Sequence, residues 1–75
     1  EVDIEGSSLV REMRANLEEA QANLARMRSS LEQGLIGASD YEPAVAQAEV
    51  AAARLQDALE TIRTRIATLA RRRAE

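Results

Sequence analysis

The chain has 75 residues, of which 45% are hydrophobic but only one is aromatic, so it can form at most one small unit with a thin aliphatic core. Its formal net charge is −3, with both signs mixed along the chain, which indicates no nucleic-acid partner. The absence of His and Cys removes disulfides, thiol chemistry and the usual transition-metal ligands, and we expect no cofactor. We expect marginal stability alone, with support from a larger polypeptide or from oligomerisation.

The first segment, residues 1–7, alternates charged and apolar side chains up to Gly6. This period of two is typical of an extended strand, but the segment is too short to stand alone. We therefore predict an extended lead-in, or the stump of a strand from a missing domain. Ser7 or Ser8 then offers a hydroxyl that can cap a helix.

A first helix is predicted over residues 8–34, because apolar residues recur there at alternating spacings of three and four. Gly34 stands where the next apolar position would fall, and glycine commonly ends helices. Leu35 and Ile36 follow outside the stripe, and we expect them to close the end of the seam between two helices. The apolar stripe consists of Val10, Met13, Leu17, Ala20, Leu24, Met27 and Leu31.

Residues 35–39 are predicted to form a tip turn, followed by a second helix over residues 40–73. Ser39 and Glu42 have the spacing of a capping box, and Pro43 fits only the first turn of a helix. The stripe of this helix consists of Tyr41, Val45, Ala48, Ala52, Leu55, Leu59, Ile62, Ile66 and Leu69.

Folding the chain about Gly37 and Ala38 aligns the two stripes, with facing position numbers that sum to 75 or 76. In this register Leu31 lies opposite Val45, and small side chains face large ones at three consecutive layers, which fills a seam without voids. The sequence therefore predicts an all-α fold, a two-helix antiparallel coiled-coil hairpin.

Few residues could carry chemistry. Asp40 and Glu42 could hold Mg²⁺, but capping and the helix dipole explain both carboxylates. Arg71 to Arg73 could contact phosphate, but a cationic helix C-terminus facing water explains them better. Because no nucleophile–base pair, phosphate loop or metal-ligand spacing is present, we expect neither an enzyme nor a small-molecule substrate.

A second strip of small residues lies on the outer side of the predicted second helix and comprises Ala46, Val50 and Ala53. Alanine is a good helix former, so the two alanines need no further explanation. Val50 does need an explanation, because an exposed β-branched residue gains nothing from helix propensity. We interpret this lateral strip as a surface that packs against neighbouring hairpins or a partner's helices.

The stretch from Ala22 to Glu49 resembles the α-hairpin of periplasmic adaptor proteins, the HlyD-like membrane fusion proteins of tripartite efflux and type I secretion systems. Family hairpins commonly read Arg, three residues, Leu, then Gly, any residue, Ile and Ser at the turn, followed by an acidic step. Arg26, Gly34 and Ile36 match this pattern, and Asp40-Tyr41-Glu42 matches the acidic step.

The chain departs from the family pattern at two positions. Ser30 occupies the tip Leu position, with Leu31 one residue late, and Gly37 occupies the tip Ser position, with Ser39 two residues late. In the family, this Arg-Leu-Ser set is implicated in meeting the outer-membrane channel, so the departures bear on channel contact.

The resemblance implies a periplasmic hairpin, attached to the inner membrane through parts outside this chain. It would dock an inner-membrane transporter to a TolC-type outer-membrane channel, with several hairpins assembled as a homo-oligomeric ring. The tip surface expected to bind the channel consists of Arg26, Ser30, Leu31, Leu35, Gly37 and Ser39.

Two other functions remain open from the sequence. The first is a stand-alone structural module that dimerises into a four-helix bundle through the lateral strip. The second is a transcript-cleavage-factor-like hairpin whose acidic tip assists RNA polymerase. Members of that family usually place Asp directly after the turn glycine, where this chain has Leu35.

Overall fold

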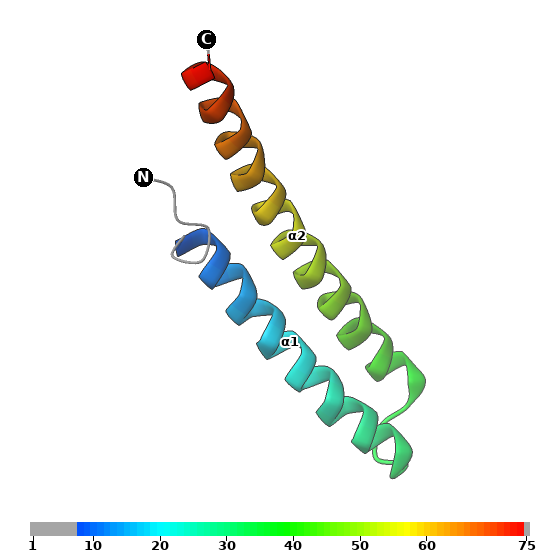
Figure 1. Ribbon diagram of the computed structural model, residues 1–75. Helices are drawn as coiled ribbons and strands as arrows, with labels where there is room; N and C mark the ends of the chain where they lie inside the picture. The colour runs from blue at the N-terminus through cyan, green and yellow to red at the C-terminus, as the bar shows by residue number, and fades with distance from the viewer. Residues whose placement is uncertain (1–7, 75) are drawn as a thin grey trace.

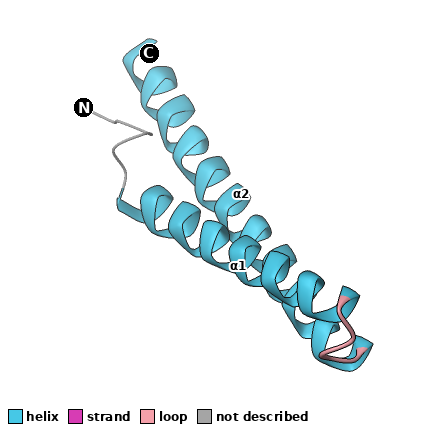
Figure 2. Ribbon diagram, turned by 90° about the horizontal axis from the view of Figure 1, so that it is seen from below, coloured by secondary structure: helices cyan, strands magenta, loops and turns pink. Residues whose placement is uncertain are grey.

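A computed structural model describes residues 8–74, so the predicted lead-in at residues 1–7 lies outside the described residues. The described chain consists of α1 (Ser8–Glu32) and α2 (Ala38–Ala74). Figure 1 shows the two helices running alongside one another in opposite directions, and Figure 2 shows the loop at one end. The molecule is 62 Å long and measures 18 Å by 12 Å across. The predicted all-α two-helix hairpin is therefore confirmed.

The apolar stripe predicted for α1 faces α2. Val10 is fully buried, with an exposed fraction of 0%, and the other six stripe residues are half-buried. Glutamates and arginines such as Arg11 and Glu12 occupy the opposite, exposed side. Because every third or fourth residue of a helix lies on one face, this helix buries the stripe that its spacing defines.

The seam of α2 is rotated from its predicted position. Ala44, Ala51 and Ala58 are buried at intervals of seven residues, whereas Ala52 and Leu69 are exposed, so their predicted place in the seam is wrong. Alanine at every seventh position of a seam presents no bulk to the partner helix. Two helices can therefore approach closely along this line.

The register of the hairpin also differs from the prediction. The loop between the helices is centred on Leu35, so facing position numbers sum to about 70 rather than 75 or 76. Arg28 and Tyr41, whose position numbers sum to 69, form a side-chain hydrogen bond, with 3.3 Å between Arg28 Nε and Tyr41 Oη. Val10 and Ile62, whose position numbers sum to 72, belong to one buried cluster.

The cause of the register difference lies at the two ends of the loop. The first helix ends at Glu32 rather than near Gly34, and the second begins at Ala38 rather than at Asp40. Both shifts move the centre of the loop toward the N-terminus. Because each residue of hinge shift changes the facing sum by two, a hinge near residue 35 accounts for the whole difference.

Within residues 8–74, this register makes the end of α2 extend past the first residue of α1. The first residue of α1, Ser8, lies opposite position 62 or so, and α2 continues to Ala74. Figure 1 shows α2 extending past the start of α1. We call residues 63–74 the overhang, and at 1.5 Å per residue they span about 18 Å.

Candidate functional site

The tip of the hairpin is fixed by a Schellman motif at the end of α1. The backbone N–H of Leu35 donates to the carbonyl of Ser30 at 2.9 Å, and that of Gly34 donates to Leu31 at 3.0 Å. Gly34 has a φ of 75°, in the left-handed region that glycine adopts without strain. These bonds satisfy carbonyls that the helix itself leaves unpaired, so the chain leaves α1 in a defined direction.

Leu35 projects from this tip into solvent. Its exposed fraction is 71%, the highest among the exposed large hydrophobic residues of the described chain. In a Schellman motif, the residue after the glycine often packs against the residue that accepts its hydrogen bond, which here is the polar Ser30. The prediction that Leu35 closes the seam is therefore wrong, whereas Ile36 is half-buried as expected.

The start of α2 is capped two residues earlier than predicted. The Gly37 carbonyl accepts bonds from the backbone N–H groups of Asp40 and Tyr41, at 3.1 and 3.3 Å. In return, Asp40 Oδ2 accepts a 3.3 Å bond from the Gly37 N–H. The capping pair is therefore Gly37 and Asp40, not Ser39 and Glu42, because the same three-residue spacing occurs at both places.

Pro43 lies deeper in the helix than expected. It is the sixth residue of α2, beyond the first turn. Because proline has no N–H, the Ser39 carbonyl lacks its usual donor four residues later in the chain. Both residues are exposed, so water can reach that carbonyl.

The carboxylate of Asp40 accepts the hydrogen bond that caps α2. Within residues 8–74, no group of three or more metal-ligating side chains occurs. Asp40 also lies in the first turn of α2, where its charge interacts favourably with the helix dipole.

Five of the six predicted tip residues lie at the closed end of the hairpin. Leu35 and Gly37 are in the loop, Ser39 is in the first turn of α2, and Ser30 and Leu31 are in the last turn of α1. Ser30 and Leu31 are half-buried and the other three are exposed. The sixth predicted residue, Arg26, lies further back along α1.

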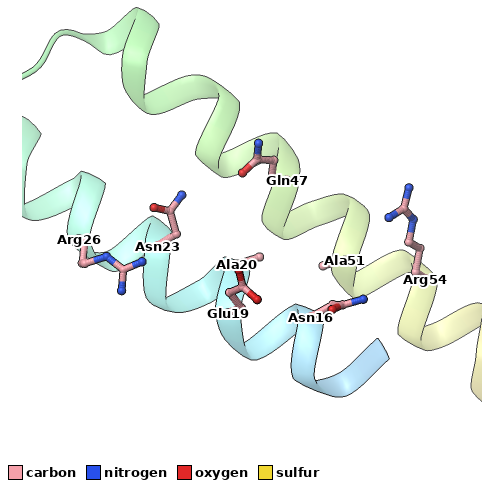
Figure 3. A pocket seen from close by; sticks show the side chains of 8 residues that line it. All are labelled: Asn16, Glu19, Ala20, Asn23, Arg26, Gln47, Ala51 and Arg54. Atoms are coloured by element: carbon pink, nitrogen blue, oxygen red, sulfur yellow. The ribbon is translucent and has the colours of Figure 1, made fainter. Parts of the chain in front are cut away.

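Arg26 lies about 9 Å before the end of α1, at 1.5 Å per residue. It lines a shallow groove of about 360 Å³ between the two helices. Ala20 and Ala51 line this groove where the helices face one another, and Figure 3 shows side chains of both helices along it. The lining residues are Asn16, Glu19, Ala20, Asn23, Arg26, Gln47, Ala51 and Arg54.

The groove was not predicted from the sequence, although one signal was available. Asn16 and Asn23 are seven residues apart and flank the apolar stripe of α1, as Gln47 and Arg54 flank the seam of α2. Amides and guanidinium groups on both walls could donate and accept hydrogen bonds. Between them lie two alanines, the half-buried Ala20 and the buried Ala51, so the groove combines polar and apolar lining.

The lateral strip adjoins this groove. Ala46, Val50 and Ala53 are all exposed, and Val50 has an exposed fraction of 48%. Each strip residue directly precedes a groove residue of α2, which turns the strip about 100° away from the groove along the helix surface. Strip and groove together form one flank of the hairpin.

Tyr41, the single aromatic residue, connects the two helices near the tip. It is half-buried, and its hydroxyl oxygen accepts the bond from Arg28 Nε. This hydrogen bond raises the pKa of the Arg28 guanidinium above its ordinary value. Arg28 therefore stays charged at any physiological pH, and the contact does not act as a pH switch.

None of the helices within residues 8–74 is long and apolar enough to span a bilayer. Comparisons with protein-family models, with curated proteins and with solved structures give no match to this chain.

Proposed function

We propose that this hairpin is the docking element of a periplasmic adaptor, and that its tip binds the helical tips of a TolC-type outer-membrane channel. The proposal rests on the family resemblance of the stretch around the turn. The observation that carries it is Leu35, a 71% exposed leucine at the apex of a hydrogen-bonded turn. An inner-membrane transporter would be the second partner, reached through other parts of the adaptor.

The tip geometry suits docking because the turn is already ordered. A side chain held on a fixed backbone loses less entropy on binding than one on a loose loop. Burying the exposed part of one leucine contributes about 1–2 kcal/mol. That is weak for a single hairpin, but several tips assembled in a ring would bind together and gain avidity.

The test is co-purification of the chain with the outer-membrane channel of its source organism. Leu35→Glu places a charge at the apex and should abolish retention of the channel, and Arg26→Asp should weaken it, with helicity unchanged in both. Ala52→Glu is the matched control, because it places the same charge on an exposed residue away from both the tip and the lateral strip. Undiminished retention by Leu35→Glu would show that the apex does not dock.

A second candidate function is dimerisation into a four-helix bundle through the lateral strip. The specific observation is Val50, whose 48% exposure on an alanine-lined helix surface leaves apolar area uncovered. Small side chains there would let a second hairpin approach closely.

Sedimentation equilibrium of Val50→Glu and Leu35→Glu separates the two candidate functions. A tight dimer that Val50→Glu dissociates and Leu35→Glu leaves intact would favour the bundle. A chain that stays monomeric at micromolar concentration, with or without either substitution, would exclude it.

A further inference from the structure

The charges of α2 are sorted along its length. Residues 40–51 contain three acidic residues and no basic one, which gives −3, whereas the overhang contains five arginines and no acidic residue, which gives +5. The helix dipole favours this polarity only within the first and last turns. Glu49, Arg63 and Arg65 lie well outside those turns, so the dipole leaves their charges unexplained.

The exposed side of α2 continues the lateral strip into the overhang. After Ala46, Val50 and Ala53, spacings of three or four residues lead on to Asp57 and then to three threonines, so one face runs along the helix. Six of the seven residues are exposed and the last is half-buried. Small side chains predominate, so another helix can approach this face closely. We call it the outer face, and it consists of Ala46, Val50, Ala53, Asp57, Thr61, Thr64 and Thr68.

A knob and a hollow lie on the outer face at equal distances from Asp57. Val50, seven residues before Asp57, is 48% exposed and forms the knob. Thr64, seven residues after Asp57, lies in a shallow hollow of about 430 Å³. Knob and hollow are therefore about 21 Å apart along the helix. A second helix that runs in the opposite direction can place its knob in this hollow and receive the first knob in its own. The hollow is lined by Asp57, Glu60, Thr61, Thr64 and Arg65.

We propose that two copies of the chain pair through their outer faces, with the α2 helices antiparallel and Asp57 on the twofold axis. The inference rests on the second candidate function, dimerisation through the lateral strip, and specifies its orientation and register. Facing position numbers of the two copies sum to 114, so Val50 of one copy enters the hollow around Thr64 of the other. The remaining layers pair Ala46 with Thr68 and Ala53 with Thr61.

The antiparallel orientation brings opposite charges together. In this register the overhang of each copy lies against residues 40–51 of the other, so +5 faces −3 twice. A parallel pair would set one overhang against the other, and two segments that each carry +5 repel one another. Charge complementarity therefore identifies a second copy in the antiparallel orientation as the occupant of the outer face.

Individual ion pairs follow from the same register. In an isologous pair, the same edge of each face meets its counterpart. Glu49 and Arg63 each directly precede a residue of the outer face, so they lie on the same edge. Their position numbers sum to 112, which places Glu49 of one copy beside Arg63 of the other. Glu42 and Arg71, whose position numbers sum to 113, form a second such pair.

Like charges meet only at the twofold axis, where Asp57 faces Asp57 of the other copy. Arg54 lies three residues earlier on the same helix and can reach the carboxylate of its own copy. The position numbers of Asp57 and Arg54 sum to 111, so Arg54 of one copy lies about 4.5 Å along the helix axis from Asp57 of the other. Two guanidinium groups therefore neutralise the two carboxylates at the axis.

The chain has no cysteine, so single introduced cysteines report the register. Under mild oxidation of the full chain, Asp57→Cys should form a disulfide-linked dimer, because a residue on the twofold axis meets its own copy. Val50→Cys alone should not, because its two copies lie about 21 Å apart along the axis and a disulfide needs Cα atoms within about 7 Å. An equal mixture of Val50→Cys and Thr64→Cys should link. Ala52→Cys, exposed on another side of α2, is the control and should remain unlinked.

Charge reversal tests the ion pairs. Glu49→Arg should weaken the dimer about fivefold in sedimentation equilibrium, since the twofold axis makes it disrupt two exposed ion pairs. Adding Arg63→Glu to the same chain reverses both members of each pair and should restore the affinity. An affinity that does not respond to Glu49→Arg would overturn the proposed register.

The other outcomes separate the orientation from dimerisation itself. Efficient linking of Val50→Cys to its own copy would show a parallel pair, which keeps dimerisation through the lateral strip and overturns the antiparallel orientation. A dimer in sedimentation that links neither at position 57 nor between positions 50 and 64 would overturn the register alone. A chain that stays monomeric in sedimentation and does not link at position 57 would overturn both the dimerisation and the orientation inferred from it.

Discussion

The rotated seam of α2 yields a sharp prediction, because two neighbouring alanines have opposite environments. Ala51 is buried, with an exposed fraction of 8%, and lines the groove, whereas Ala52 is exposed. Leu and Ala have similar helix propensities, so Ala51→Leu and Ala52→Leu differ mainly in packing. Adding three carbon atoms at Ala51 forces the helices apart, and overpacking of this kind costs about 1–3 kcal/mol.

The measurement is thermal unfolding followed by circular dichroism at the helix band. For a chain of this size, the expected loss lowers the Tm of Ala51→Leu by about 4–24 °C. Ala52→Leu should change the free energy of unfolding by less than about 0.5 kcal/mol, as surface substitutions usually do. Sedimentation of each variant checks that both have the same oligomeric state, so that their Tm values can be compared. If Ala52→Leu were the more destabilising of the two, α2 would face α1 through its predicted stripe and the rotated seam would be wrong.

Four further substitutions test the turn and the core. Gly34→Ala should destabilise the hairpin by about 1–2 kcal/mol in urea titration, because alanine resists the left-handed conformation. By contrast, Gly37→Ser should stabilise it by a few tenths of a kcal/mol, because Gly37 has open space around it and serine is a better cap. Asp40→Asn removes the charge at the cap and should cost about 0.3–1 kcal/mol, with the difference shrinking in 1 M NaCl. Ile62→Ala should cost about 2–4 kcal/mol in the same titration, since Ile62 is buried in the core cluster. An effect of Gly37→Ser as large as that of Gly34→Ala would contradict the assigned turn.

The hairpin itself could be predicted because both helices repeat an apolar pattern and glycine separates them. The rotation of α2 could not be predicted, because positions 51 and 52 are both alanine and hydrophobicity therefore cannot tell which of them is buried. Only the packing of α1 against α2 decides which alanine is buried. The predicted stripe therefore shares seven of its nine residues with the buried and half-buried face of α2 and departs from it at Ala52 and Leu69.

The position of the loop was ambiguous for a similar reason. A potential cap followed three residues later by an acid occurs at Gly37 and Asp40 and again at Ser39 and Glu42. Serine is generally the better cap, so sequence reasoning favours the later pair. The Schellman motif at the end of α1 leaves few residues for the loop, and this favours the earlier pair. Exposure of Leu35 depends on the same motif, and apolarity alone predicts its burial.

The distribution of burial along the hairpin shows how its tip is held in place. Val10, Ala58 and Ile62 form the buried cluster, and they lie at the end far from the tip. Near the tip, Ala44 is the buried residue of α2 and contributes little apolar area. The tip is therefore held mainly by its local hydrogen bonds rather than by a core.

Amide hydrogen exchange can measure this gradient. Amides of α2 around Ala58 and Ile62 should exchange more slowly than those around Ala44, because opening the cluster requires separating both helices. Gly34→Ala should accelerate exchange near the tip and leave the cluster amides almost unchanged. Uniform acceleration along both helices would mean that the hairpin opens as a single unit, and the tip would then owe its order to the whole seam rather than to its own caps.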